Sequence, residues 1–294
     1  MRENSAYALI TGASAGLGSS FSYELASRGY NLFLVSLPHE NLASMASFIR
    51  TNYGVEVIIF ETDLTLFGAA EVVLKEINEH NIQIGMLINN AGLGQNQYFE
   101  QTDEQYLRSM IELNCLATVS LTHALIPKLK QQPKSYIINI SSMGGFFALP
   151  GKSVYAASKG FIIQFSQSLK WELEQYGINV SVVCPGGIIT NTDKYLIIRD
   201  FGWLSRATTS SAKEVSVYAL NQSLKGKHRI IPGRLNRFLF FINGLIPAFI
   251  RNKLLAYSMK HISKREQQLS VVDHKEDQSQ EAHITVERDS IISD

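Results

Sequence analysis

The chain has 294 residues, of which 45% are hydrophobic and 18% charged, and its formal net charge at pH 7 is +1. This length fits one large domain or two small ones, and the apolar content is sufficient for a sizeable core. The nearly balanced charge excludes a strongly basic character, so we predict no nucleic-acid partner.

Two cysteines, Cys115 and Cys184, lie inside apolar segments and are predicted to be buried free thiols, as is typical of a reducing compartment. Residues 1–5 lead almost directly into a strand, without the long apolar region and cleavage site of a secretory signal. We therefore expect a cytoplasmic protein. The sequence predicts no metal site.

Short apolar segments alternate with segments of helical periodicity over most of the chain. Strands are predicted at residues 7–11, 31–36, 55–60, 84–89, 136–140 and 178–184. Helices are predicted at residues 19–28 and 42–53, from Leu64 to about residue 80, and at residues 102–130 and 153–176. Continuous apolar strands that alternate with helices predict an α/β fold, with a doubly wound, mainly parallel, Rossmann-like sheet and helices on both faces.

The first predicted strand runs directly into a glycine-rich turn, Gly12-Ala13-Ser14-Ala15-Gly16-Leu17-Gly18, and then into a helix. Glycines let the backbone approach a phosphate, and the free N–H groups and dipole of the helix favour an anion there. The spacing Gly-x-x-x-Gly-x-Gly differs from the common Gly-x-Gly-x-x-Gly pattern. The turn favours dinucleotide binding over an ordinary connection between strand and helix.

Ligands of parallel sheets bind beyond the carboxyl ends of the strands. Four residues directly follow predicted strands and therefore share this edge: Gly12, Asn90, Ser142 and Pro185.

Tyr155 and Lys159 lie four residues apart in a predicted helix, so both side chains lie on one face and can reach one ligand. A lysine cation near a phenol favours the phenolate and is expected to lower the pKa of Tyr155. Tyr155 is thus a candidate general acid or base, although a surface pair is the alternative interpretation.

Together these motifs resemble the short-chain dehydrogenase/reductase family over residues 5–232. The likeness is carried by the glycine-rich turn at 11–18, Asn-Asn-Ala-Gly at 89–92, Ser142, the pair Tyr155 and Lys159, and Pro185-Gly186. It implies reversible hydride transfer between NADP(H) or NAD(H) and a carbonyl/alcohol pair.

The resemblance also implies roles for the catalytic residues. Tyr155 would protonate the substrate oxygen, Lys159 would bind the nicotinamide ribose, and Ser142, preferred over Ser141 by spacing, would donate to the developing oxyanion. Asn114 would hold a proton-relay water, or alternatively serve as a capping or core amide. The implied cofactor-binding residues are Gly12, Ser14, Gly16, Leu17, Gly18, Asp63, Leu64, Asn90, Ala91, Gly92, Tyr155, Lys159, Pro185, Gly186 and Thr190.

Two of these residues have alternative interpretations as helix caps. Asp63 matches the acidic residue that contacts adenine, but it could cap the following helix. Thr190 matches the residue that contacts the carboxamide, and it too could cap a helix.

The choice between NADP and NAD is weakly marked. Residues 36–40 after the second strand read Ser-Leu-Pro-His-Glu, without an acid at the strand end that would repel a phosphate. This favours NADP, although the arginine usual in NADP-binding members is also missing.

The substrate is predicted to be a lipophilic ketone. Apolar residues dominate both 188–204, after Pro185, and 143–150, after Ser142. Such a lining suits a 3-oxoacyl, steroid or similar group, although packing of an extra helix is the alternative. The rival functions are an NAD-dependent alcohol or hydroxysteroid dehydrogenase and a non-catalytic dinucleotide-binding, membrane-associated protein.

The charge becomes uneven beyond the predicted catalytic domain, residues 1–232. Residues 215–265 contain ten Lys or Arg and no Asp or Glu, and they enclose a 13-residue apolar run at 238–250. This run is shorter than the roughly 20 residues that span a membrane, so residues 233–265 suit an anionic membrane surface. An active-site cover and a subunit contact are the alternatives, and the family resemblance suggests a homodimer or tetramer. Residues 266–294, with eight acids and two bases, are predicted to be a disordered tail.

Overall fold

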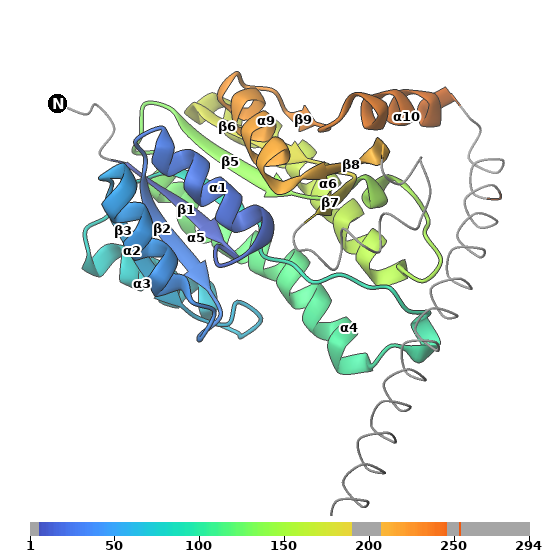
Figure 1. Cartoon of the computed structure of the whole chain (residues 1–294), viewed down its shortest axis with the longest axis horizontal. Helices are drawn as coiled ribbons and strands as arrows, with labels where there is room; N and C mark the ends of the chain where they lie inside the picture. The colour runs from blue at the N-terminus through green and yellow to red at the C-terminus, as the bar shows by residue number, and fades with distance from the viewer. Residues whose placement is uncertain (1–5, 190–206, 246–252, 254–294) are drawn as a thin grey trace, which may run out of the picture.

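Figure 1 shows the computed structural model of the chain, which describes residues 6–189, 207–245 and 253. Seven strands form one parallel sheet in the order β3-β2-β1-β4-β5-β6-β9. The strands are β1 Tyr7–Thr11, β2 Asn31–Ser36, β3 Val57–Glu61, β4 Ile84–Asn89, β5 Ser135–Ile140, β6 Ile178–Val183 and β9 Arg229–Ile230. The predicted α/β, Rossmann-like class is thus confirmed.

All six predicted strands form, with shifts of one or two residues at some of their ends. The seventh strand, β9, pairs with β6 through Arg229 and Ile230. A strand of two residues is too short to produce a periodic pattern. A separate parallel pair, β7 Gly187–Ile189 and β8 Thr209–Ser211, was likewise not predicted.

Helices cover both faces of the sheet (Figure 1). Successive residues of β1 face opposite layers, because strand side chains alternate: Ala8 packs with α1, α2 and α9, and Leu9 packs with α3, α5 and α6. The α-helices of the described residues are α1 Gly16–Ser27, α2 Leu42–Tyr53, α3 Ala69–Glu79, α4 Glu104–Ile111, α5 Thr118–Leu129, α6 Ser153–Leu173, α9 Ala212–Leu224 and α10 Arg234–Leu245.

The predicted helix at 102–130 forms with a widened centre. Asp103 caps α4 by accepting a hydrogen bond from the Tyr106 N–H at 3.0 Å. A π-helical segment, η2 Glu112–Ala117, then joins α4 to α5. Such segments occur mostly as single turns inside α-helices, frequently at functional sites. This segment carries Asn114.

One helical stretch among the described residues, Glu104–Leu129, is long and apolar enough by composition to cross a membrane. Its residues Leu121, Leu125 and Leu129 are buried in the layer between α5 and the sheet. This is the position of a core helix.

A buried polar chain ties two helices to the sheet. The Asn89 side-chain amide donates to Thr122 Oγ1 of α5 at 3.0 Å and to Asn139 Oδ1 of β5 at 2.8 Å. Asn139 in turn donates to Ser166 Oγ of α6 at 2.9 Å. Because buried polar groups require partners, this chain fixes α5 and α6 relative to the strand ends that carry the site.

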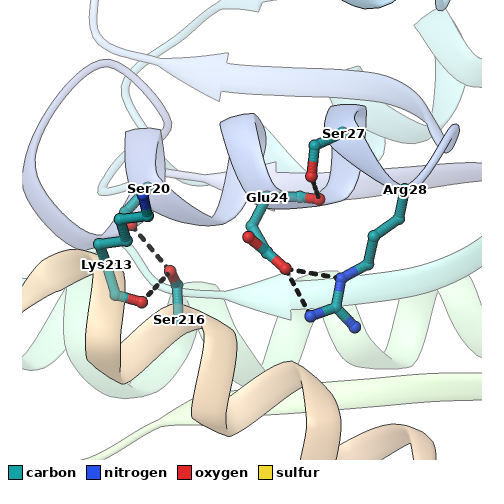
Figure 2. Close-up of polar contacts among 6 residues, drawn as sticks. All are labelled: Ser20, Glu24, Ser27, Arg28, Lys213 and Ser216. Carbon is teal, nitrogen blue, oxygen red and sulfur yellow. Dashed lines mark hydrogen bonds and ion pairs between the residues drawn. The ribbon is translucent and has the colours of Figure 1, made fainter.

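Helix α9 packs against α1 through small polar side chains. Figure 2 shows Ser20 of α1 facing Ser216 of α9, whose hydroxyl oxygens lie 2.8 Å apart. The Ser216 hydroxyl also donates to the Lys213 carbonyl at 3.1 Å. On the adjoining turn of α1, Arg28 Nε donates to Glu24 at 2.8 Å. This packing holds the helix that begins at the glycine-rich turn.

The segment after residue 232 is described only through α10 and Lys253. Its division from the catalytic domain stays a prediction, and the proposed acidic tail at 266–294 lies outside the described residues.

His228, just before β9, provides a pH test of the fold. Its Nδ1 lies 2.9 Å from the Val180 carbonyl, and its buried Nε2 has no hydrogen-bond partner among the described residues. Burial, with nearby Lys170 and Arg229, lowers the pKa of His228 below 6.5, although the bond to Val180 opposes this.

The unfolded chain therefore binds a proton at His228 before the folded protein does, and stability falls as the pH drops below about 6.5. We expect His228→Gln to reduce this loss, measured by urea unfolding between pH 5 and 8. Identical pH profiles for both proteins would contradict the assignment.

Candidate active site

The glycine-rich turn adopts a conformation that requires glycine. Gly12 and Gly16 have positive φ angles of 61° and 57°. A Cβ atom on Gly18 would lie 1.9 Å from the Gly12 carbonyl oxygen, so no larger residue fits there. Helix α1 begins at Gly16, earlier than the predicted residue 19, and the methyl group of Ala15 cannot cap its first N–H groups. The turn is a cradle for an anionic group.

Thr11 and Asn90 join this turn to the end of β4. Thr11 Oγ1 accepts hydrogen bonds from the N–H groups of Asn90 and Ala91, each at 3.0 Å. The Asn90 side-chain amide donates to the carbonyls of Thr11 at 2.9 Å and Gly12 at 3.2 Å. Asn90 thus shapes the cleft by holding backbone. Thr11 shares this role, although its only sequence signal was its place before Gly12.

Asn114 is buried and connects η2 with the loop after β4. Its Oδ1 accepts from the Leu93 N–H at 2.8 Å, and its Nδ2 donates to Leu93 O and Ser158 Oγ, each at 3.0 Å. A Cβ atom on Gly92 would lie 2.8 Å from Asn114 Oδ1. The amide group is therefore engaged in positioning α6, as its interpretation as a core amide expects. The relay-water role stays a prediction.

Ser142 lies at the end of β5 and caps the short helix η3, Met143–Phe146. Its Oγ accepts from the Gly144 N–H at 3.0 Å, and its interaction with the Tyr155 phenol lowers the pKa of that phenol. The neighbouring Ser141 is buried, and its hydroxyl donates to the Lys159 carbonyl at 2.7 Å. Of the two serines, Ser142 is thus the one beside the phenol, and its catalytic role stays a prediction.

Lys159 is only 6% exposed on α6. Its Nζ donates to the Ile140 carbonyl at 3.0 Å and lies 6.0 Å from the centre of the Tyr155 ring. Burial lowers the pKa of Lys159 to about 8, although the nearby thiols of Cys115 and Cys184 oppose this shift. The ammonium therefore remains charged at neutral pH in a largely dry position.

Burial raises the pKa of Tyr155, and the hydrogen bond with Ser142 only partly opposes this rise. The sequence-based expectation that Lys159 lowers this pKa is therefore wrong as a net direction, because desolvation outweighs the favourable interactions. At neutral pH the phenol keeps its proton and is suited to donate it.

The remaining predicted residues are spread around this edge. Asp63 Oδ1 accepts from Thr65 N at 2.8 Å and Thr65 Oγ1 at 2.7 Å, so it stabilises a turn, whereas α3 begins later, behind Gly68. Leu64 is buried in the core layer with α3.

On the other side of the cleft, the Pro185 carbonyl accepts from Met143 N at 2.8 Å. A Cβ atom on Gly186 would lie 2.4 Å from the Thr208 carbonyl oxygen. Thr190 lies outside the described residues.

Two long-range contacts at the site were not foreseen. The buried Gln95 accepts at Oε1 from Val154 N at 3.1 Å and Tyr155 N at 3.4 Å, and thereby caps the helix that carries Tyr155. The Ser14 hydroxyl donates to the Glu40 carboxylate. Neither pairing has a local sequence signal, because the partners lie in different segments.

The residues present fit a nicotinamide dinucleotide. The glycine cradle at Gly12, Gly16 and Gly18 would hold its phosphates, and Lys159 offers a cation close to the phenol of Tyr155. A phosphate-binding turn that precedes a Ser/Tyr/Lys set on one sheet edge is the arrangement expected of a nicotinamide-dependent oxidoreductase.

Residues 6–198 match the family model described as short chain dehydrogenase. The chain is similar to mouse 17-beta-hydroxysteroid dehydrogenase type 3, with 30% identity over 272 residues that cover 90% of this chain and 87% of the relative. It is 35% identical over 182 residues to a very-long-chain 3-oxoacyl-CoA reductase of Pyrenophora tritici-repentis. That match covers 60% of this chain but only 53% of the fungal protein.

A short-chain dehydrogenase from Sphingobium yanoikuyae in complex with NADPH has a similar structure. It is 31% identical, with a TM-score of 0.69, and the match covers 82% of this chain and 94% of that chain. This chain belongs to the short-chain dehydrogenase/reductase family.

The buried charge of Lys159 is expected to lower the stability of the fold while it supports turnover. Its folded pKa of about 8 lies below the ordinary 10.5, so burial of the charge at pH 7 opposes folding by about 3 kcal/mol. We expect Lys159→Met to abolish turnover and to raise the free energy of unfolding by about 1–3 kcal/mol, measured with urea at pH 7.

The sign of the Lys159 contribution to stability can be tested at alkaline pH. Between pH 8 and 10.5 the unfolded chain keeps the Lys159 proton more strongly, so the stability contribution of this group rises with pH. The advantage of Lys159→Met should shrink over this interval. A destabilised variant at pH 7 would show that the packing and hydrogen bond of Lys159 outweigh the cost of its charge.

Proposed function

We propose that this protein reduces a lipophilic ketone with NADPH and that Tyr155 is the general acid. The observation that carries the proposal is the set of Ser142, Tyr155 and Lys159 at one sheet edge, in which Lys159 is buried and partial burial raises the pKa of the Tyr155 phenol. The bound cofactor would supply the hydride.

Each residue has a distinct task in this reaction. Ser142 donates a hydrogen bond to the carbonyl oxygen and fixes its position beside the phenol. Tyr155 gives its proton to that oxygen as negative charge develops. Lys159 holds a positive charge near the phenolate that remains and favours it over the neutral phenol.

The substrate class is proposed from the residues beside Ser142 and from the names of the relatives. Met143, Phe146 and Phe147 pack in an apolar cluster next to the site. Relatives are named as very-long-chain 3-oxoacyl-CoA reductase and 17-beta-hydroxysteroid dehydrogenase. A 3-oxoacyl group or a steroid ketone would therefore be the first substrates to test.

NADP remains the proposed cofactor because β2 ends in Ser36, a buried hydroxyl, rather than in a carboxylate. One contact argues against NADP: the Glu40 carboxylate accepts a hydrogen bond from Ser14 in the phosphate-binding turn. This contact supports the second candidate, an NAD-dependent alcohol or hydroxysteroid dehydrogenase, because a carboxylate there would repel the additional phosphate of NADPH.

A homodimer or tetramer and a cytoplasmic location also stay proposals. Exposed apolar side chains on α4, η2 and α6 would supply contact area for a second copy, namely Ile111, Leu116, Phe161 and Trp171.

Tyr155→Phe removes the proton donor and keeps the ring. We expect it to bind NADPH within about threefold of the wild-type Kd, but to lose at least about a thousandfold in kcat for ketone reduction. Cofactor binding is followed by nicotinamide fluorescence, and turnover by loss of NADPH absorbance.

Tyr176→Phe is the matched control, because Tyr176 is 45% exposed near the far end of α6. It should leave both quantities unchanged. Full turnover by Tyr155→Phe would eliminate Tyr155 as the acid, and failure of the wild type to bind either dinucleotide would overturn the proposed function.

Glu40→Gln tests the cofactor choice. Loss of one negative charge near the phosphate-binding turn should tighten NADPH binding by about fivefold to tenfold, because like charges a few ångströms apart repel by roughly 1 kcal/mol or more. Binding of NADH should change by less than about twofold.

Titrations with both cofactors measure the ratio of the two dissociation constants. Glu71→Gln in the first turn of α3 is the control for a general change in charge. An unchanged ratio for Glu40→Gln would show that this carboxylate does not act on cofactor choice.

A further inference from the structure

Helix α10 is anchored to the catalytic domain by its inner side. Asn236 is 3% exposed, and its amide donates to the carbonyls of Thr208 and Pro232, each at 3.0 Å. The Phe240 ring lies 4.7 Å from the Phe146 ring, centre to centre. These contacts place α10 against η3, the segment that follows Ser142.

Two arginines add further contacts between α10 and the catalytic domain. The Arg229 guanidinium lies 5.8 Å from the centre of the Phe146 ring and 5.4 Å from that of Phe240. Arg237 donates to the Tyr218 hydroxyl of α9 at 3.0 Å. Helix α10 therefore has a fixed orientation, and its other side faces outward at the edge of the molecule (Figure 1).

The outward side combines aromatic rings with cations. Phe238 is 58% exposed and Phe241 is 66% exposed, whereas Phe240 between them faces inward. Arg234 lies one turn before Phe238, so Arg234, Phe238 and Phe241 follow one another along a single helical stripe. We call these three residues the outer face of α10.

The positive charge of this face opposes the dipole of its own helix. Arg234 begins the helix, and the first turn contains no acidic residue, although the helix dipole favours an anion there. Residues 215–265 contain ten Lys or Arg and no Asp or Glu. A second copy of this face would bring like charges together, so charge complementarity favours an anionic partner over self-association.

We propose that the outer face of α10 binds the surface of anionic phospholipid bilayers. Phenylalanine rings insert at the boundary between headgroups and acyl chains, and Arg234 pairs with lipid phosphates and carboxylates. Because Phe240 joins α10 to η3, the bilayer would lie near the apolar side chains that follow Ser142. The inference goes beyond the proposed reaction, since vesicle binding requires neither cofactor nor turnover.

Cosedimentation of the full chain with vesicles tests this surface. We expect at least about tenfold tighter binding to vesicles containing roughly one-third phosphatidylserine than to pure phosphatidylcholine, with binding that weakens as salt increases. Phe238→Ser combined with Phe241→Ser should weaken binding to anionic vesicles by about tenfold or more. Arg234→Gln should weaken it by about threefold to fivefold and reduce the salt dependence.

Phe67→Ser is the matched control, because Phe67 is fully exposed in the turn before α3 and should not affect vesicle binding. Turnover of a soluble ketone without vesicles checks that the α10 variants fold, since none of these residues belongs to the catalytic set. Absence of wild-type binding to anionic vesicles would overturn the proposal, as would unchanged binding by the double phenylalanine variant. Equal, salt-independent binding to neutral vesicles would also overturn it.

Discussion

The site depends on one buried cation. The Lys159 ammonium donates to the carbonyl at the end of β5, and no carboxylate among the described residues pairs with it, so its burial is costly. Space for it is made by glycine. A Cβ atom on Gly92 would lie 3.2 Å from Lys159 Nζ, and one on Gly145 would lie 2.7 Å from the Lys159 carbonyl carbon. Glycines in loops after two different strands thus make room for one residue, Gly92 for its side chain and Gly145 for its backbone.

The same burial determines which form of the neighbouring phenol prevails. Desolvation disfavours the phenolate more strongly than the hydrogen bond with Ser142 favours it, so the pKa of Tyr155 rises. A protonated Tyr155 is ready to donate to a carbonyl oxygen, whereas alcohol oxidation begins with the opposite protonation state. Tyr155 therefore holds, at neutral pH, the proton that its proposed role as general acid requires.

The sequence predicted those features that consecutive residues encode. Six strands were found because each is a continuous apolar run, and the pair Tyr155 and Lys159 was found because four residues bring side chains to one helical face. The cap provided by Gln95 could not be predicted, since it joins residues in separate segments. The direction of the pKa shift at Tyr155 depends on the depth of burial, which residue spacing does not determine.

Composition identified a basic, apolar segment after residue 232 but left an active-site cover and a membrane surface as alternatives. The structure explains why they are not exclusive within α10. Phe240 faces η3 while Phe238 and Phe241 face outward, so neighbouring residues of one helix serve opposite sides. Coupling between a membrane and catalysis would require an element with two arrangements, and the anchor through Asn236 holds α10 in one. In the proposed membrane contact, α10 would therefore have a positional role and would not switch the site.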